Sequence, residues 1–292
     1  MKIELDLLNN SYDYFHTSLI NYKIADEFGN HDDERSNPLN KQKWKTAFVM
    51  LVQAIELLLK QILFDIHPNL IRENIDAKST DILKTVSIVQ AINRINLFSD
   101  IKIVEDKIDF IIKCAQLRNE FIHFKVEFNS QQLKKKYAML YHLYKNIHAD
   151  FIQNEIVLIE ERQKYFMQEL DRFTEDMVIF RGGEYTHEQY LNLLKDIENN
   201  NKIDVYVDLE GNAFKRIKYG NEADSIGEAY LMKHNISDES PAEFFSRNLT
   251  YCGACEAKKG EYHLELCDCE ICPKCFGQLL SCGCFPDKSV FE

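Results

Sequence analysis

Apolar residues recur every three to four positions through most of the first 170 residues, with short polar breaks between the runs. This spacing is typical of amphipathic helices. It predicts helices over 5–22, 41–66, 81–98 and 104–125. A fifth run, 131–170, is either one long helix or two helices joined near Asp150. Asp81, which follows Ser-Thr, supplies a side chain suited to capping the third helix.

The pattern changes after residue 171. Gly182 and Gly183 break the helical spacing, and residues 203–219 alternate between apolar and polar around Gly211, which predicts a β-hairpin. We therefore expect a mainly α fold. Its parts are an up-and-down helical bundle over 1–171, a small α+β accessory region over 172–249, and a cysteine-rich, zinc-ribbon-like module over 250–292.

Length and composition fit a globular protein. The chain has 292 residues, of which 45% are hydrophobic, which is enough for two domains and a short third module. It has no unbroken run of 18 apolar residues, and its acidic start lacks the apolar core of a signal peptide. These features predict a cytoplasmic protein that does not bind membranes.

The net charge of −12 is unevenly distributed. Residues 1–150 hold 20 Lys+Arg and 20 Asp+Glu, whereas residues 151–292 hold 15 against 27 and carry the whole excess. This balance excludes a general nucleic-acid coat protein, although the first part can still bind RNA locally. The second part favours a basic partner.

A narrow polar stripe marks the second predicted helix. From Ala47 to Leu63 the only polar residues are Gln53, Glu56, Lys60 and Gln61, and the first three fall within about 60° of one another on a helix of 3.6 residues per turn. Two explanations fit the stripe. Glu56 and Lys60 form an i,i+4 pair, or Glu56 faces a cation on another helix, for which Arg118 is the candidate.

The fourth predicted helix carries Arg118, Asn119 and His123 near its end. Asn119 and His123 lie about 40° apart around the helix, whereas Arg118 lies about 140° from His123. An arginine holds phosphate oxygens, and a histidine can move a proton near neutral pH. By spacing alone, however, ordinary surface positions explain the three residues as well, and one copy makes an incomplete site.

The stretch "LRNEFIHF", with Arg118, Asn119 and His123, resembles the signature of the HEPN superfamily. "QAIELLLKQIL", with Glu56, resembles an acidic position in some of its ribonucleases. The resemblance covers roughly residues 1–150. It implies a helical bundle that cleaves RNA without a metal at a homodimer interface. Several members are toxins or antiviral defence effectors, while others are non-catalytic.

The resemblance implies a role for each of these residues. His123 is expected to act as general acid or base, and Arg118 to bind the scissile phosphate. Asn119 is expected to orient the site, and Glu56 to position Arg118 or to join the proton transfer. We expect an endoribonuclease acting as a homodimer, with RNA as substrate and an antitoxin or other protein as a possible partner. The alternative is a non-catalytic adaptor or nucleotide-sensing scaffold that recruits a protein through the zinc tail.

Four lysines near the motif are candidates for guiding an RNA backbone: Lys125, Lys134, Lys135 and Lys136. A solvated helix start is the simpler explanation of the last three. Cys114, one turn before Arg118, is expected to be a small buried residue.

Eight of the nine cysteines lie between residues 252 and 284. Their short spacings in a cytoplasmic chain indicate metal sites, and closed four-ligand zinc sites are structural. A sequential grouping gives two zinc ions per chain and omits only Cys269; a cross-braced grouping, in which Cys267 and Cys269 join Cys282 and Cys284, is the alternative. The two sequential sites use, first, Cys252, Cys255, His263 and Cys267 and, second, Cys272, Cys275, Cys282 and Cys284. No cofactor is expected for catalysis.

Overall fold

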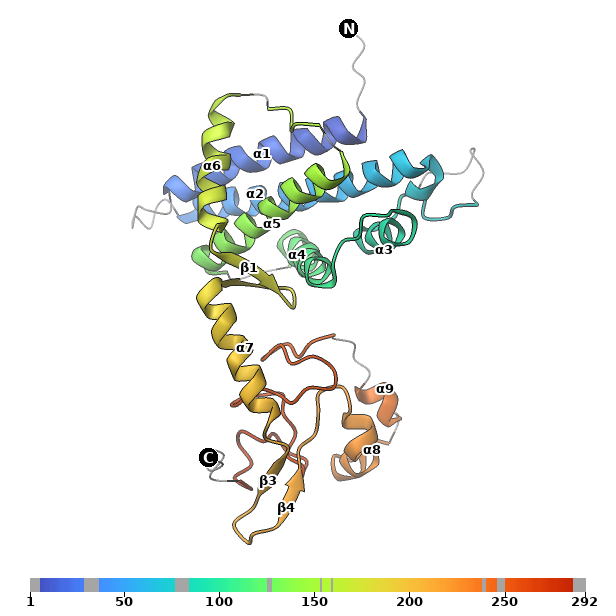
Figure 1. Ribbon diagram of the computed structural model, residues 1–292, viewed down its shortest axis with the longest axis vertical. Coiled ribbons are helices and arrows are strands. Elements are labelled where there is room, and N and C mark those ends of the chain that lie inside the picture. Colours follow the sequence, from blue (N-terminus) through green and yellow to red (C-terminus); the bar gives the residue numbers. More distant parts are fainter. Residues whose placement is uncertain are drawn as a thin grey trace. The chain divides into compact units, whose positions relative to one another are not determined.

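The computed structural model describes residues 6–28, 37–76, 84–124, 128–152, 154–158, 160–237, 240–245 and 250–285. These are mainly helical, as predicted, with two small antiparallel hairpins (Figure 1). The elements are α1 (Leu7–Phe28), α2 (Asn37–Ile66), a 3-10 turn (Pro68–Ile71), α3 (Ile88–Phe98), α4 (Glu105–His123), α5 (Ser130–Phe151), α6 (Arg162–Thr174), β1 (Met177–Phe180), β2 (Gly183–Thr186), α7 (His187–Asn201), β3 (Val205–Val207), β4 (Ala213–Lys215), α8 (Glu222–Lys233) and α9 (Pro241–Phe245).

The chain forms two compact units, Met1–His187 and Glu188–Glu292. The first unit holds α1 to α6 and the β1–β2 hairpin. The second holds nearly all of α7, then the β3–β4 hairpin, α8, α9 and the cysteine-rich segment.

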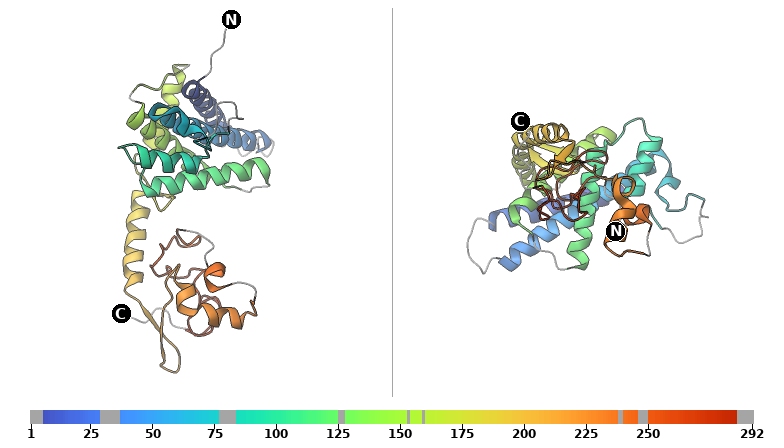
Figure 2. Two further views of the ribbon diagram at one scale, coloured as in Figure 1. Left: turned by 90° about the vertical axis from the view of Figure 1, so that its right-hand side faces the viewer. Right: turned by 90° about the horizontal axis from the view of Figure 1, so that it is seen from below.

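Helices α1, α2 and α5 lie side by side, and α3 and α4 run across them (Figures 1 and 2). Buried hydroxyls link the three. Ser11 donates to the carbonyl of Ala54 at 2.8 Å, and its hydroxyl lies 3.0 Å from that of Tyr144. Two turns later along α1, Ser18 donates to the carbonyl of Ala47, which precedes Ala54 on α2. Helix α1 is therefore antiparallel to α2, and every buried hydroxyl named here has a partner.

Helix α2 is the centre of the first core. Its residues Phe48, Leu51, Ile55 and Leu58 are fully buried. This burial agrees with the narrow polar stripe, which leaves most of the helix surface apolar. Each such side chain contributes about 1.5–3 kcal/mol through removal of apolar surface from water. By length and composition, Leu39–Ile66 is also long and apolar enough to cross a membrane, and 61% of its most apolar window is buried in the fold.

Several helix limits differ from the prediction: α1 extends to Phe28 rather than ending at 22, and α2 begins at Asn37 rather than at 41. The third helix begins at Ile88 rather than at 81, because Ser87 and Gln90 form a reciprocal capping box there. Just before it, Thr85 is extended and forms an isolated bridge. The predicted cap, Asp81, lies outside the described residues. The run over 131–170 is two helices, since α5 ends at Phe151, close to the predicted junction.

The β1–β2 hairpin holds α4. Its turn has two residues with positive φ, Arg181 at 51° and Gly182 at 73°, as in a type I′ turn. The amide of Arg181 donates to Asp106 at 3.0 Å, and Lys113 donates to the Arg181 carbonyl at 3.1 Å. A Cβ on Gly182 would lie 3.0 Å from that of Asp109. Only glycine both fits this approach and adopts this φ without strain.

The second unit has little apolar core of its own. Its described residues form two small clusters: one joins Tyr206, Cys272, Leu279 and Phe285, and the other joins Cys252, Ala257 and Cys267. A segment with so few buried side chains needs another source of stability, such as metal ions.

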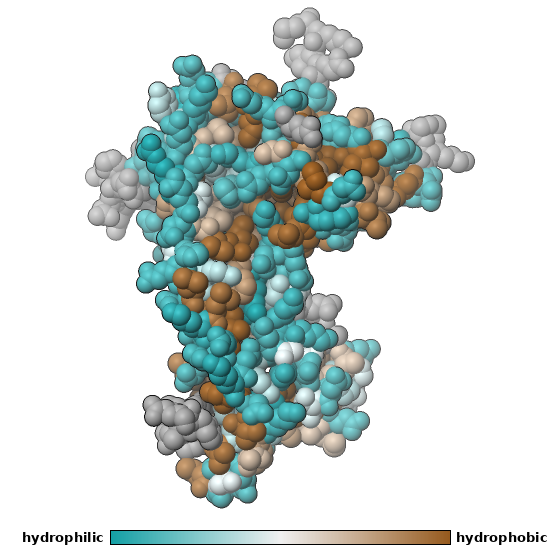
Figure 3. Space-filling view, in the orientation of Figure 1, coloured by the Kyte–Doolittle hydropathy of each residue, from teal (hydrophilic) through white to brown (hydrophobic). Residues whose placement is uncertain are grey.

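Part of the apolar surface of the first unit lies near α3. Leu97 is 71% and Phe98 51% exposed, and Figure 3 shows apolar residues (brown) gathered on this side of the unit.

Candidate functional site

Glu56 on α2 and Arg118 on α4 form an ion pair. Arg118 Nη1 donates to Glu56 Oε2 at 2.9 Å, and the two side chains are 17% and 16% exposed. Arg118 Nε also donates to Asn119 Oδ1 at 3.2 Å. The prediction that Glu56 faces Arg118 is confirmed, and the long arginine side chain does turn back towards the bundle.

The alternative pairing of Glu56 is present as well. Lys60 Nζ donates to Glu56 Oε1 at 2.7 Å and to Thr85 Oγ1 at 3.0 Å. The two explanations of the polar stripe were therefore not exclusive, because each carboxylate oxygen takes one cation. Lys60 therefore belongs to the site, and its position one turn after Glu56 is the signal for it in the sequence.

Glu56, Lys60 and Arg118 form a triad in which two cations favour the ionised form of the Glu56 carboxylate. Burial alone would raise the pKa of Glu56, but hydrogen bonds from Lys60 and Arg118 outweigh it and lower the pKa below its ordinary value. With Glu56 ionised, the three side chains carry one net positive charge. The triad thus fixes Arg118 and retains an excess positive charge beside it.

His123 is placed differently. It is the last residue of α4 and is exposed, with Ile122 (50%) and Phe124 (73%) exposed on either side. Within the described part of the chain, no hydrogen bond or ion pair joins His123 to Arg118, Asn119 or Glu56. The fold brings the last three together and leaves His123 apart on the same helix. The separation of His123 from Arg118 agrees with the angular spacing, whereas Asn119 bonds to Arg118 although it lies only about 40° from His123 around the helix.

The candidate RNA-guiding lysines are mostly engaged. Lys134 binds Asp26 at 2.7 Å, and Lys136 binds Glu184 at 2.8 Å. Lys135 is half-buried, and Lys125 lies outside the described residues. Two of the four positive charges are therefore balanced within the first unit.

Cys114 is fully buried one turn before Arg118. Burial raises the pKa of its thiol to about 12. It remains a neutral, small packing residue, as predicted.

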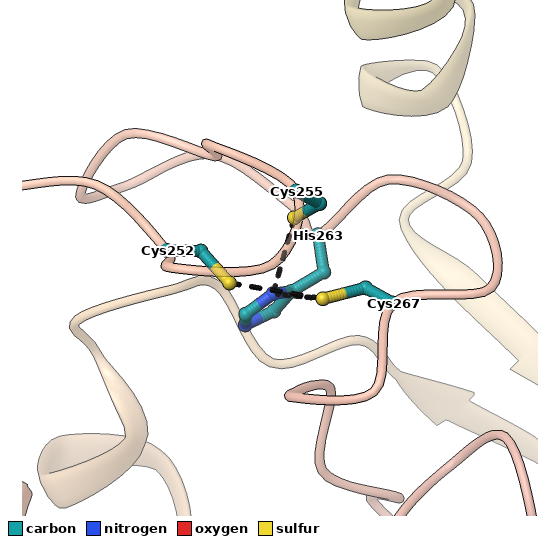
Figure 4. Close-up of side chains that lie close together, drawn as sticks. All are labelled: Cys252, Cys255, His263 and Cys267. Atoms are coloured by element: carbon teal, nitrogen blue, oxygen red, sulfur yellow. Dashed lines mark hydrogen bonds between the residues drawn. The ribbon is translucent and has the colours of Figure 1, made fainter. Parts of the chain in front are cut away.

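The first cysteine cluster joins Cys252, Cys255, His263 and Cys267. Figure 4 shows the imidazole of His263 pointing among the three sulfurs. Its Nδ1 lies 3.5 Å from the sulfur of Cys255 and 3.3 Å from that of Cys267, and the sulfurs of Cys252 and Cys267 are 3.7 Å apart. A tetrahedral ion with metal–sulfur bonds of about 2.3 Å separates its sulfurs by about 3.8 Å. The cluster can hold such an ion.

The second cluster joins Cys272, Cys275, Cys282 and Cys284, whose ligand atoms all lie within 4.8 Å of one another. The sequential grouping is thus the one the fold adopts, and the cross-braced grouping is wrong. Cys269 belongs to neither cluster and is exposed.

The two clusters begin with the same local turn. The amide of Cys252 donates to the carbonyl of Ala257 at 2.9 Å, and that of Cys272 donates to Gly277 at 2.8 Å, twenty residues later. The residue after the second cysteine of each pair has a φ of 59° or 58°. Each turn aims two sulfurs at one point, so each cluster is a separate local unit.

This arrangement offers two kinds of chemistry. A fixed guanidinium on α4 can bind an anion such as a phosphate, and two closed four-ligand clusters can each hold a metal ion. Comparison with family models, curated proteins and solved structures found no match to the chain.

Proposed function

We propose that the chain is a metal-independent endoribonuclease that acts as a homodimer. The observation that carries the proposal is the ion pair between Arg118 and Glu56. It gives the motif arginine a fixed place on the helix that ends with His123. The resemblance of residues 1–150 to the HEPN superfamily supports the same reading.

In the proposed reaction His123 removes the proton of a ribose 2′-hydroxyl, and the 2′-oxygen forms a bond to the adjacent phosphorus. The bond from phosphorus to the 5′-oxygen breaks, and that oxygen takes a proton from an acid. The products are a 2′,3′-cyclic phosphate and a 5′-hydroxyl. Arg118 neutralises the charge that develops on the phosphate oxygens, and Asn119 orients the site.

The chemistry needs both a base and an acid. One chain offers a single exposed histidine in the motif, so the second proton-transfer group is expected from the His123 of a second copy. This requirement is the chemical reason for proposing a homodimer.

We assign zinc to both cysteine clusters. Thiolate and imidazole ligands in closed four-ligand sets suit zinc, and such sites are structural. Zinc binding worth about 10–16 kcal/mol can fold a segment with a core as small as this one. The expected setting is cytoplasmic, as a defence effector or toxin restrained by an antitoxin or another protein.

A non-catalytic adaptor or nucleotide-sensing scaffold is the second candidate. It is favoured by the ion pairs of Lys134 and Lys136, which remove two of the cations expected to guide RNA.

A cleavage assay separates the two candidates. Purified protein is incubated with mixed RNA in EDTA, beside His123→Ala and Arg118→Ala, with zinc content checked after incubation. Arg172→Ala, an exposed arginine on α6, and His234→Ala, an exposed histidine in the second unit, are the matched controls. The proposal expects cleavage by wild type and both controls, and losses of about 100-fold or more in the motif variants. Equal inactivity of all dimeric proteins favours the adaptor.

A further inference from the structure

The second unit contains a pocket of about 400 Å³. It lies between the last turns of α7, the β3–β4 hairpin and two loops of the cysteine-rich segment. Its residues belong to one compact unit, and one of them, Cys267, is a ligand of the first cluster. None of the roles proposed above uses this pocket.

A buried ion pair forms part of its wall. Arg216 and Glu270 have side chains only 1% and 3% exposed, and Arg216 Nη2 lies 2.9 Å from Glu270 Oε1. The rest of the guanidinium is also occupied: Nη1 donates to Asn200 and Ile203, and Nη2 donates to the His263 carbonyl at 2.7 Å. Arg216 therefore has no donor left for an anionic ligand.

The carboxylate of Glu270 can accept further hydrogen bonds. Its Oε1 accepts from Arg216 Nε at 3.0 Å and from the hydroxyl of Tyr206 at 3.1 Å. Within the described residues, no hydrogen bond reaches its Oε2. This oxygen is not among the fully buried polar atoms that lack a partner, so it is accessible in the pocket wall and can accept a hydrogen bond from a ligand.

The remaining charges of the pocket are negative. Asp196 and Glu265 line it and are exposed. The last turn of α7 adds the partial negative charge of a helix C-terminus. The whole second unit, with 11 Lys+Arg and 19 Asp+Glu, has a net charge of −8. The pocket thus attracts cations.

Its other walls are aliphatic. Leu264 and Leu279 line the inside, and Leu266 and Leu280 are 68% and 41% exposed. Leucine walls with a carboxylate among them match a side chain that has an apolar stem and a cationic end.

We propose that this pocket binds a lysine or arginine side chain of a protein partner. The stem lies along the leucines, and the cation donates to Glu270 Oε2 and is held by Asp196 and Glu265. Charge complementarity with a unit of net charge −8 selects a basic partner surface over an acidic or neutral one. The pocket is a docking point that does not depend on ribonuclease activity.

The test uses the full-length, metal-loaded protein with ¹³C-labelled leucine methyl groups. The probes are two capped tripeptides, Gly-Lys-Gly and Gly-norleucine-Gly, which differ only in the terminal ammonium. We expect the lysine peptide to shift the methyl signals of Leu264 and Leu279 and to bind about three- to five-fold more tightly. Equal binding of the two peptides, or no shift with either, overturns the proposal.

Charge variants separate the pocket from the general acidity of the unit. The double variant Asp196→Asn, Glu265→Gln keeps Glu270 and should therefore reduce the preference for the lysine peptide without abolishing it. Glu198→Gln is the matched control, because Glu198 lies on the same helix, is 73% exposed and does not line the pocket. It should keep the full preference for lysine. The proposal is overturned if the control reduces the preference or the double variant keeps it in full, provided that both retain two metals per chain.

Discussion

Replacing Glu56 by glutamine is expected to destabilise the helical unit by about 2–3 kcal/mol. The carboxylate lies 2.7 Å from Lys60 and 2.9 Å from Arg118, and the three side chains are only 9–17% exposed. Removing one partner of a fully buried pair costs about 3–5 kcal/mol, whereas an exposed pair is worth less than about 1 kcal/mol. These groups are mostly buried, so the expected loss lies between the two values.

The assay is urea unfolding followed by the fluorescence of Trp44. It is the single tryptophan of the chain and is 3% exposed in the helical unit. Glu169→Gln is the control, because Glu169 pairs with Lys23 at 2.8 Å but is 52% exposed. It should cost less than about 1 kcal/mol.

Lys60→Met separates the two contacts of the triad. It removes the buried cation but leaves the pair between Glu56 and Arg118 in place, so it should cost less than Glu56→Gln. If Glu56→Gln costs no more than Glu169→Gln, the triad is not the stabilising contact inferred here.

Three further changes test other parts of the account. The hydrogen bonds from Lys60 and Arg118 hold the pKa of Glu56 below its ordinary 4.5. The difference in unfolding free energy between wild type and Glu56→Gln should therefore be full above about pH 5 and shrink as acid protonates the folded carboxylate. A difference that urea titrations find constant down to about pH 3 contradicts this. Gly182→Ala should destabilise the first unit and speed amide hydrogen exchange in α4. Gly211→Ala, also at positive φ but with open space around it, should leave exchange in α4 unchanged. Equal exchange in the two variants refutes the close contact between Gly182 and Asp109. Native mass spectrometry should find one metal in Cys267→Ser and two in Cys269→Ser, and loss of both metals from Cys267→Ser would contradict separate clusters.

The helical unit was predictable because its signals are local. Apolar spacing of three to four residues identified α2 as a central helix, and the lone carboxylate on its polar stripe required a cation. These two facts left Lys60 and, 62 residues away in the sequence, Arg118 as the two candidate partners of Glu56, and the structure has both contacts. The start of α3 differs from the prediction because the helix is capped by Ser87 and Gln90, whose Ser-x-x-Gln spacing is a signal in the sequence that the prediction did not use.

The cysteine clusters were also predictable, since chain order and short spacings restrict which ligands can meet. The pocket of the second unit was not. The pair of Arg216 and Glu270 joins β4 to a loop 54 residues later, and neither residue belongs to a periodic pattern. Such a contact depends on how the hairpin meets the metal-binding turns. The fold, not the local sequence, determines it.

The claim of a ribonuclease site shared between two copies is tested most directly by mixing wild type with an inactive variant. Wild type and an excess of His123→Ala are unfolded together, refolded together with zinc, and assayed on RNA in EDTA beside each protein treated alone. The account predicts that cleavage per wild-type chain falls well below that of wild type refolded alone, because a mixed dimer holds one His123 where the reaction needs two. A mixture that forms mixed dimers and keeps the full activity of its wild-type chains would contradict it.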